Sequence, residues 1–308
     1  MLKTVFLAVM ALACCGPCAA VAWAHGVVGD YMFLEPLVAE DPTPANELNI
    51  LQPGWIKTAE ANHYSIGFSM EKILWLDENY MPRFSIGGGT AWTHVSPHEG
   101  AGLGGFDDLE LFAKYSFYYS LDHEFLMSIG AQLLLPAGDT GVEEQSHTSL
   151  GPLFLWEKGF GDLPNKPLIK FLRPFGIQSD FGYVPALGGH TSHLMFADAV
   201  LEYSLPYLSN NVHDIGLKWP LRNLFLFNEI NYGQLVSGPS GETFPHLFAT
   251  PGIAYLGHDF EVALGTQLAL NGATVAENHA AILGLIDIFF DSVVPRLGNW
   301  TVNRGFPG

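Results

Sequence analysis

Cysteine is scarce in this sequence. Its three cysteines, Cys14, Cys15 and Cys18, lie near the amino terminus, so residues 19–308 contain none. The rest of the chain therefore cannot form a disulfide or a thiolate metal site. A chain of 308 residues without such cross-links needs another source of stability, either a large apolar core or a lipid bilayer.

Long apolar runs and charged residues are also scarce. Beyond the amino-terminal segment no run reaches the roughly 20 residues of a membrane helix, because Pro136, Asp287 and Asp291 interrupt the longest candidates. Charged residues make up 14% of the chain, against roughly 25% in soluble domains. There are only 13 basic residues against 31 acidic ones. This balance excludes nucleic acid as a partner, because binding its phosphates depends on clustered Lys and Arg.

The residues that are abundant indicate a membrane protein built from strands. Hydrophobic residues account for 48% of the chain, aromatic residues for 13%, and there are 34 glycines. In lipid every backbone N–H and C=O must be satisfied within the protein, and without spanning helices a closed barrel is the remaining solution. The sequence therefore predicts an all-β fold, a single antiparallel transmembrane β-barrel. A soluble β-sandwich is the competing fold, but it would ordinarily carry more surface charge.

The first 24 residues have the pattern of a secretory signal peptide. Lys3 precedes an apolar stretch, and Ala22-Trp23-Ala24 is an Ala-x-Ala cleavage pattern. We expect cleavage before His25, which leaves residues 25–308 as one barrel domain. In an alternative reading, a loose lipobox leads to acylation of Cys14 or Cys15.

Alternation of apolar with polar or small residues, the period of a strand, runs through much of the chain. In a barrel one of the two faces meets lipid and the other an aqueous lumen. Five segments alternate cleanly: 64–70, 109–119, 125–135, 197–205 and 262–270. Six weaker ones are 84–94, 150–158, 174–183, 224–236, 248–256 and 281–290.

The connections between these segments alternate between short turns and longer polar links, as in outer-membrane barrels. This parity requires one further strand, expected near residues 48–56, because bacterial single-chain barrels have even strand counts. The prediction is therefore about 12 strands, with both termini in the periplasm. Residues 159–173 and 206–223 break the short-turn rule and are expected to hold short helices or plug elements.

Four segments resemble a known family: residues 25–30 (HGVVGD), 108–115 (DLELFAKY), 161–164 (GDLP) and 172–175 (LRPF). They are similar to sequences of the outer-membrane transporter family named for the meta-pathway of phenol degradation. The resemblance implies a barrel that gives small organic compounds a passive route, and it carries no residue-level mechanism. One departure is that such barrels usually end on an aromatic residue, whereas this chain continues past Phe290.

Polar residues on the inward face of the predicted strands are the candidate lumen lining. Acidic residues dominate this set, which predicts a lumen that attracts cations. The alternative is that these side chains only hydrate the interior. The candidates are Glu110, Lys114, Asp198, Glu202, Glu229, Gln267 and Asp287.

Histidines gather at the expected external loops and supply the candidate metal ligands His94, His98, His190 and His193. Converging imidazoles could bind copper, zinc or nickel there. The competing interpretation is that long loops simply hold more residues of every type. His25, as a new amino terminus, could chelate copper, although no second ligand is identifiable.

No enzyme signature is present, and no catalytic residue or cofactor is expected. The sequence lacks a Gly-x-Ser-x-Gly elbow, a His-Glu-x-x-His pair and a nucleotide-binding glycine loop. Ser146 and His147 are adjacent, but neighbours on a strand point to opposite faces and make a poor hydrolase dyad.

These observations together predict a porin-like passive channel in the Gram-negative outer membrane for small, hydrophobic or aromatic, or cationic solutes. Its partners would be outer-membrane lipid, the solute and, during biogenesis, the barrel-insertion machinery. The alternative is a non-transporting surface scaffold or a metal-capturing barrel. A soluble periplasmic binding protein is a third class.

Overall fold

The computed structural model describes residues 26–139, 147–188, 193–237 and 245–304. The predicted leader (1–24), His25, Ser146 and His190 lie outside these residues.

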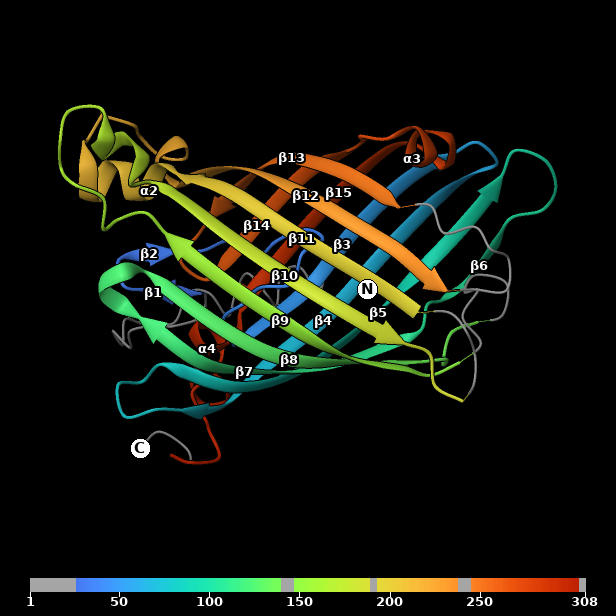
Figure 1. Cartoon of the computed structure of the whole chain (residues 1–308), viewed down its shortest axis with the longest axis horizontal. Coiled ribbons are helices and arrows are strands. Elements are labelled where there is room, and N and C mark those ends of the chain that lie inside the picture. The colour runs from blue at the N-terminus through green and yellow to red at the C-terminus, as the bar shows by residue number, and fades with distance from the viewer. Residues whose placement is uncertain (1–25, 140–146, 189–192, 238–244, 305–308) are drawn as a thin grey trace, which may run out of the picture.

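The described chain forms a closed antiparallel β-barrel of twelve strands, which confirms the predicted fold class (Figure 1). Closure follows from β4, which pairs with both β3 and β5. The strands are β3 (Glu47–Thr58), β4 (Ala61–Leu76), β5 (Pro82–Pro97), β7 (Leu109–Ser120), β8 (Phe125–Leu135), β9 (Ser149–Gly159), β10 (Phe175–Pro185), β11 (His193–Ser204), β12 (Leu224–Ser237), β13 (His246–Leu256), β14 (Phe260–Ala269) and β15 (Asn278–Phe289).

Strand β3 is the additional strand that parity required near residues 48–56. One short strand, β6 (Leu103–Phe106), was not predicted and lies inside an expected loop. It pairs with the carboxyl-terminal part of β5, where Trp92 is opposite Phe106 and Val95 is opposite Leu103. Strand β7 pairs with β5 only from Phe84 to Gly89, so β6 supplies the hydrogen-bonding partner for β5 beyond that point.

The barrel exterior is apolar because alternate side chains of each strand point outward. Ile66 on β4 is 46% exposed and Leu264 on β14 is 55% exposed, as expected for side chains that meet hydrocarbon. An irregularity between Ser116 and Tyr118 interrupts the alternation of β7. Tyr118 therefore lies outside. Tyr119, the last residue of the predicted segment 109–119, is part-buried and donates a hydrogen bond to Asp77.

Two ends of the barrel can be distinguished in Figure 1. The terminal end carries the hairpin of β1 (Val27–Val28) and β2 (Tyr31–Met32), and also α2 and α4; the distal end carries β6 and α3. The long links at the terminal end contain η2 (Ile169–Leu172), α2 (Leu205–Tyr207), η3 (Leu208–Val212) and η4 (Leu221–Asn223), and the distal α3 spans Gly272–Glu277. None of the helices in the described part of the chain is long and apolar enough to cross a membrane.

The residues after the last strand fold back onto the terminal end. Strand β15 ends at Phe289, and α4 (Phe290–Val293) and α5 (Pro295–Gly298) follow. Phe290, the last residue of the predicted segment 281–290, therefore belongs to a helix. The Lys72 ammonium on β4 donates to the carbonyl of Gly298 at 2.7 Å, and the Val302 N–H donates to the carbonyl of Leu74 at 2.9 Å. The carboxyl-terminal tail thus packs against the end of β4.

The amino-terminal hairpin is anchored at the same end by aromatic packing. The Tyr31 ring lies 4.7 Å from that of Phe33 and 5.3 Å from that of Tyr207, measured between centroids. The Tyr31 hydroxyl donates to the carbonyl of Pro174 at 2.9 Å. Val28 and Leu126 complete this buried cluster. The chain is therefore held firmly just before it enters the barrel.

Candidate functional site

Residues 33–46, here called the plug segment, lie inside the barrel. The segment bonds to side chains from eight strands around the wall, and a segment can reach that many strands of a closed barrel only from within. The wall partners are Glu71, Lys114, Ser128, Glu157, Asp180, Glu202, Glu229 and Glu261.

The plug segment has no strand partner, so its N–H groups need other acceptors. Buried wall carboxylates supply them. Glu229 accepts from the N–H groups of Leu37 (2.7 Å), Val38 (3.0 Å) and Ala39 (3.2 Å). Asp180 accepts from the Glu40 N–H at 2.7 Å. These hydrogen bonds satisfy the N–H groups of residues 37–40, so these side chains define the path of the plug segment.

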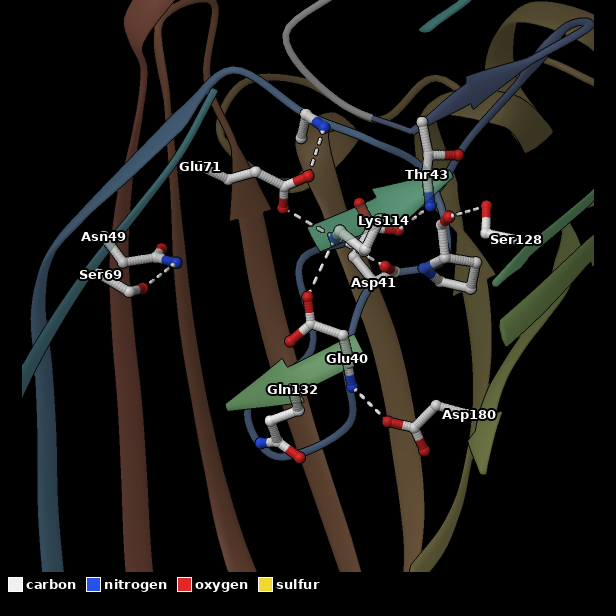
Figure 2. Close-up of polar contacts among 12 residues, drawn as sticks. Glu40, Asp41, Thr43, Asn49, Ser69, Glu71, Lys114, Ser128, Gln132 and Asp180 are labelled. Carbon is white, nitrogen blue, oxygen red and sulfur yellow. Dashed lines mark hydrogen bonds and ion pairs between the residues drawn. The ribbon is translucent and has the colours of Figure 1, made fainter. Parts of the chain in front are cut away.

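One ammonium group ties the plug segment to the opposite side of the wall (Figure 2). Lys114 Nζ lies 3.0 Å from Glu40 Oε1 and 2.7 Å from Glu71 Oε2. It also donates to the carbonyl of Asp41 at 2.8 Å. In the described part of the chain, Lys114 is the only buried Lys or Arg. Lys114 is therefore the one buried cation of the described chain that joins plug and wall.

Acidic groups greatly outnumber that cation. Twelve carboxylates are buried among the described residues, which leaves the interior strongly acidic. They are Asp41, Glu47, Glu71, Glu124, Glu157, Asp180, Asp198, Glu202, Glu229, Glu261, Asp287 and Asp291.

Part of the interior is apolar rather than wet, which the sequence did not predict. Leu34 and Ala39 of the plug segment pack with inward-facing side chains from the wall, and Leu37 lies against the same cluster. The wall members are Val200, Phe225, Phe227, Ala254, Leu256, Ala263, Leu285 and Phe289. Burial of this surface adds a hydrophobic contribution to plug binding.

Two cavities flank residues 37–40, here called the tip of the plug segment. One has a volume of about 410 Å³ and the other about 380 Å³. Val38, Glu40 and Glu110 line both, so the tip separates them. Asp107 and Asp108 add acidic groups to the first cavity, and both cavities suit small ligands by size.

At the terminal end, Glu124 clamps three links together. Its carboxylate accepts from the Gly161 N–H at 2.6 Å and from the Tyr207 hydroxyl at 3.0 Å. Burial raises the pKa of Glu124, while these two hydrogen bonds oppose the increase. Burial also raises the pKa of Tyr207 to about 12. The tyrosine therefore keeps its proton and remains the donor at physiological pH.

Comparison with known proteins rests on structure alone. No family model and no curated protein matches the sequence. The fold is similar to that of the COG4313 outer membrane channel from Pseudomonas putida F1, with a TM-score of 0.56 and 10% identity over 83% of this chain and 99% of that chain. This chain has the fold of an outer-membrane β-barrel.

Two further solved barrels overlap more loosely. The outer membrane phospholipase A from Escherichia coli gives a TM-score of 0.37 at 7% identity, over 82% of this chain and 94% of that one. The translocator domain of the autotransporter NalP from Neisseria meningitidis gives 0.39 at 12%, over 80% and 88%.

The barrel places three of the seven candidate lumen residues at the cavities and four against the plug segment or β3. Glu110, Asp198 and Gln267 line the cavities. The other four bond to protein: Lys114, Glu202 and Glu229 to the plug segment, and Asp287 to the N–H of Leu48 on β3 at 3.1 Å.

The three candidate metal histidines that the structure describes, His94, His98 and His193, form no metal-binding group with one another. His94 stacks on Trp92, and His193 stacks on Tyr183 of the neighbouring strand β10. Neither they nor His98 belongs to a group of metal-binding side chains in the described chain. The one such group found there is carboxylic, formed by Glu35, Asp41 and Glu47.

Sequence reasoning missed the plug segment itself. Residues 33–46 contain Pro36, Pro42 and Pro44 and show no strand period. A stretch that precedes the first predicted barrel strand yet carries apolar Leu34 and Leu37 could have signalled an internal segment. The isolated Lys114 on an inward face among acids was a second signal for a buried partner.

Proposed function

We propose that this outer-membrane barrel is a passive channel for small cationic solutes, narrowed by its own plug segment. The observation that carries the proposal is the pair of acid-lined cavities beside the plug tip, which share Val38, Glu40 and Glu110. Carboxylates in a narrow, low-dielectric passage raise the local concentration of cations. The volumes of the two cavities limit the solute to a small molecule.

We also propose an orientation and a family for the barrel. The terminal end would face the periplasm and the distal end the exterior. Membership of the transporter family named for the meta-pathway of phenol degradation is supported by the four sequence motifs and by likeness of fold to the Pseudomonas putida channel. The family resemblance suggests an aromatic solute, whereas the acidic interior favours a cationic one.

Planar bilayers test this function. The full-length protein should give a small conductance with cation selectivity, read from the reversal potential in a salt gradient. Glu110→Gln should move that potential toward zero, because Glu110 lines both cavities. Glu99→Gln, a change in an exposed turn, is the matched control and should leave it unchanged.

Deletion of residues 33–46 should raise the conductance several-fold. If the deleted protein does not insert, Glu229→Ala serves instead, because it removes three plug contacts while keeping the chain. If neither the wild type nor the variant without the plug contacts conducts ions, the channel proposal is overturned and a non-transporting scaffold is supported. Liposome swelling with cationic, neutral aromatic and anionic solutes then separates the solute classes.

A further inference from the structure

Two long links at the terminal end are basic, although the chain as a whole has a net charge of −18. Residues 163–173 and 215–222, here called the link surface, contain five of the chain's 13 basic residues and no Asp or Glu. Within the described chain none of the five forms an ion pair with a carboxylate. The link surface therefore suits an anionic partner. Its basic residues are Lys166, Lys170, Arg173, Lys218 and Arg222.

The link surface also exposes large apolar side chains. Leu168 is 82% exposed and Trp219 is 75% exposed. The backbone of Leu168 has φ 71° and ψ −49°, a strained conformation that non-glycine residues rarely adopt. Exposed apolar side chains gathered among polar ones mark a contact surface. The other large apolar side chains exposed on it are Ile169, Phe171, Leu172, Ile215 and Leu221.

Hydrogen bonds place the link surface beside the lipid-facing wall. Trp219 Nε1 donates to the hydroxyl of Tyr255 at 3.0 Å, and the hydroxyl of Tyr203 donates to the carbonyl of Phe171 at 3.5 Å. Both tyrosines occupy outward positions, since their neighbours on β13 and β11 are buried. The rings of Phe171 and His213 meet edge to face at 6.3 Å and join the two links. The link surface therefore continues the apolar outer wall at the terminal end (Figure 1).

We propose that the link surface lies in the headgroup layer of the membrane and binds anionic phospholipids. Its basic side chains contact the lipid phosphates, and its apolar side chains reach the boundary of the acyl chains. Trp and Tyr favour this depth because part of each side chain is apolar and part is polar. Lys and Arg near an anionic membrane surface add electrostatic attraction. A soluble protein partner, in contrast, would not require a surface that adjoins the hydrocarbon-facing wall.

Fluorescence quenching tests whether the link surface contacts lipid. Residues 25–308 contain no cysteine, so protein expressed as these residues with Leu168→Cys carries one environment-sensitive label. In liposomes of phosphatidylcholine and phosphatidylglycerol, its emission should be shifted to the blue. A nitroxide lipid with the nitroxide near its headgroup should quench it several-fold more than a label at Asp122→Cys, in an exposed turn of the same end. Emission typical of water, with equal quenching at both sites, would overturn the proposal and leave a protein as the partner.

The basic residues are tested by changing first the lipid and then the protein. Quenching of the Leu168→Cys label should fall several-fold in liposomes of phosphatidylcholine alone. Lys166→Gln, Lys218→Gln and Arg222→Gln combined should cause the same loss in the mixed liposomes, whereas Lys57→Gln, at an exposed site of the distal end, should cause none. Gel mobility verifies that each variant is folded.

Equal quenching in the two kinds of liposome would overturn the recognition of anionic lipid. This comparison changes no residue, so it decides the matter even if the combined variant does not fold. Both leaflets of the liposomes have the same lipids, so the result does not depend on the orientation of the barrel. Conductance is measured separately, and failure here leaves the channel proposal untouched.

Discussion

Lys114 and Glu71 form an ion pair of 2.7 Å inside the barrel, with side-chain exposures of 0% and 1%. Glu71 uses its other oxygen to accept the Ala45 N–H at 3.0 Å. The pair therefore connects strands β4 and β7 to the plug segment between them. Because both charges are removed from water, loss of either partner leaves an uncompensated buried charge.

Lys114→Met should destabilise the folded barrel by about 3–5 kcal/mol, since it strands the carboxylates of Glu71 and Glu40. Urea titration followed by the heat-modifiable gel shift measures the loss. Lys57→Met, which changes an exposed lysine on β3, is the control and should shift the midpoint little. Equal midpoints for the two variants would contradict the central role of Lys114.

Glu229→Ala should loosen the tip of the plug segment. The N–H groups of Leu37, Val38 and Ala39 lose their acceptor, and each unsatisfied buried donor costs about 1–3 kcal/mol. Residues 19–308 contain no cysteine, so Val38→Cys in protein expressed as residues 25–308 gives one maleimide site at the tip. Labelling of that site should become several-fold faster in Glu229→Ala. An unchanged rate, equal to that of the exposed control Glu99→Ala, would mean that other contacts hold the tip.

The tail should respond to pH through Asp291. Burial raises the pKa of Asp291 to about 6 from its usual 3.8. The folded state therefore binds this proton more tightly than the unfolded state, so stability falls as pH rises from about 4 to 6 and stays lower above 6. Asp291→Asn mimics the protonated form and should stabilise the protein by about 1–3 kcal/mol at pH 8.

Urea midpoints of wild type and Asp291→Asn, taken at pH 8 and at pH 4, measure this effect. The difference should disappear at pH 4, where the wild-type carboxyl is protonated when folded. Glu78→Gln, in an exposed turn, should show no such convergence. A variant that is less stable than the wild type at pH 8 would contradict the sign.

Leu264→Arg should impair membrane insertion. Leu264 lies mid-strand on β14 and is 55% exposed on the outer face. An arginine facing lipid at the bilayer centre costs about 2–4 kcal/mol. Folding yield into liposomes, read by gel mobility, should drop, whereas Leu187→Arg, beyond the end of β10, should fold normally. Comparable yields would place Leu264 outside the hydrocarbon.

Strand positions were predictable because a lipid-facing exterior imposes a strict two-residue period. The expected segment 125–135 coincides with β8, and the strand required by parity near 48–56 proved to be β3. Departures occurred where local geometry breaks that period. The irregularity between Ser116 and Tyr118 turns Tyr119 inward. Strand β6 pairs with the carboxyl-terminal part of β5, which β7 leaves unpaired.

The sequence by itself determined the closed barrel, since its alternation, its lack of long apolar runs and its few charges leave no other way to satisfy a backbone in lipid. Only the tertiary structure decided what fills that barrel. The sequence pattern of an inward-facing acidic residue is the same whether its side chain contacts water, lines a cavity or bonds to another part of the chain. Glu229 and Glu110 differ because residues 33–46, which follow no period, fold back beside one and leave space beside the other.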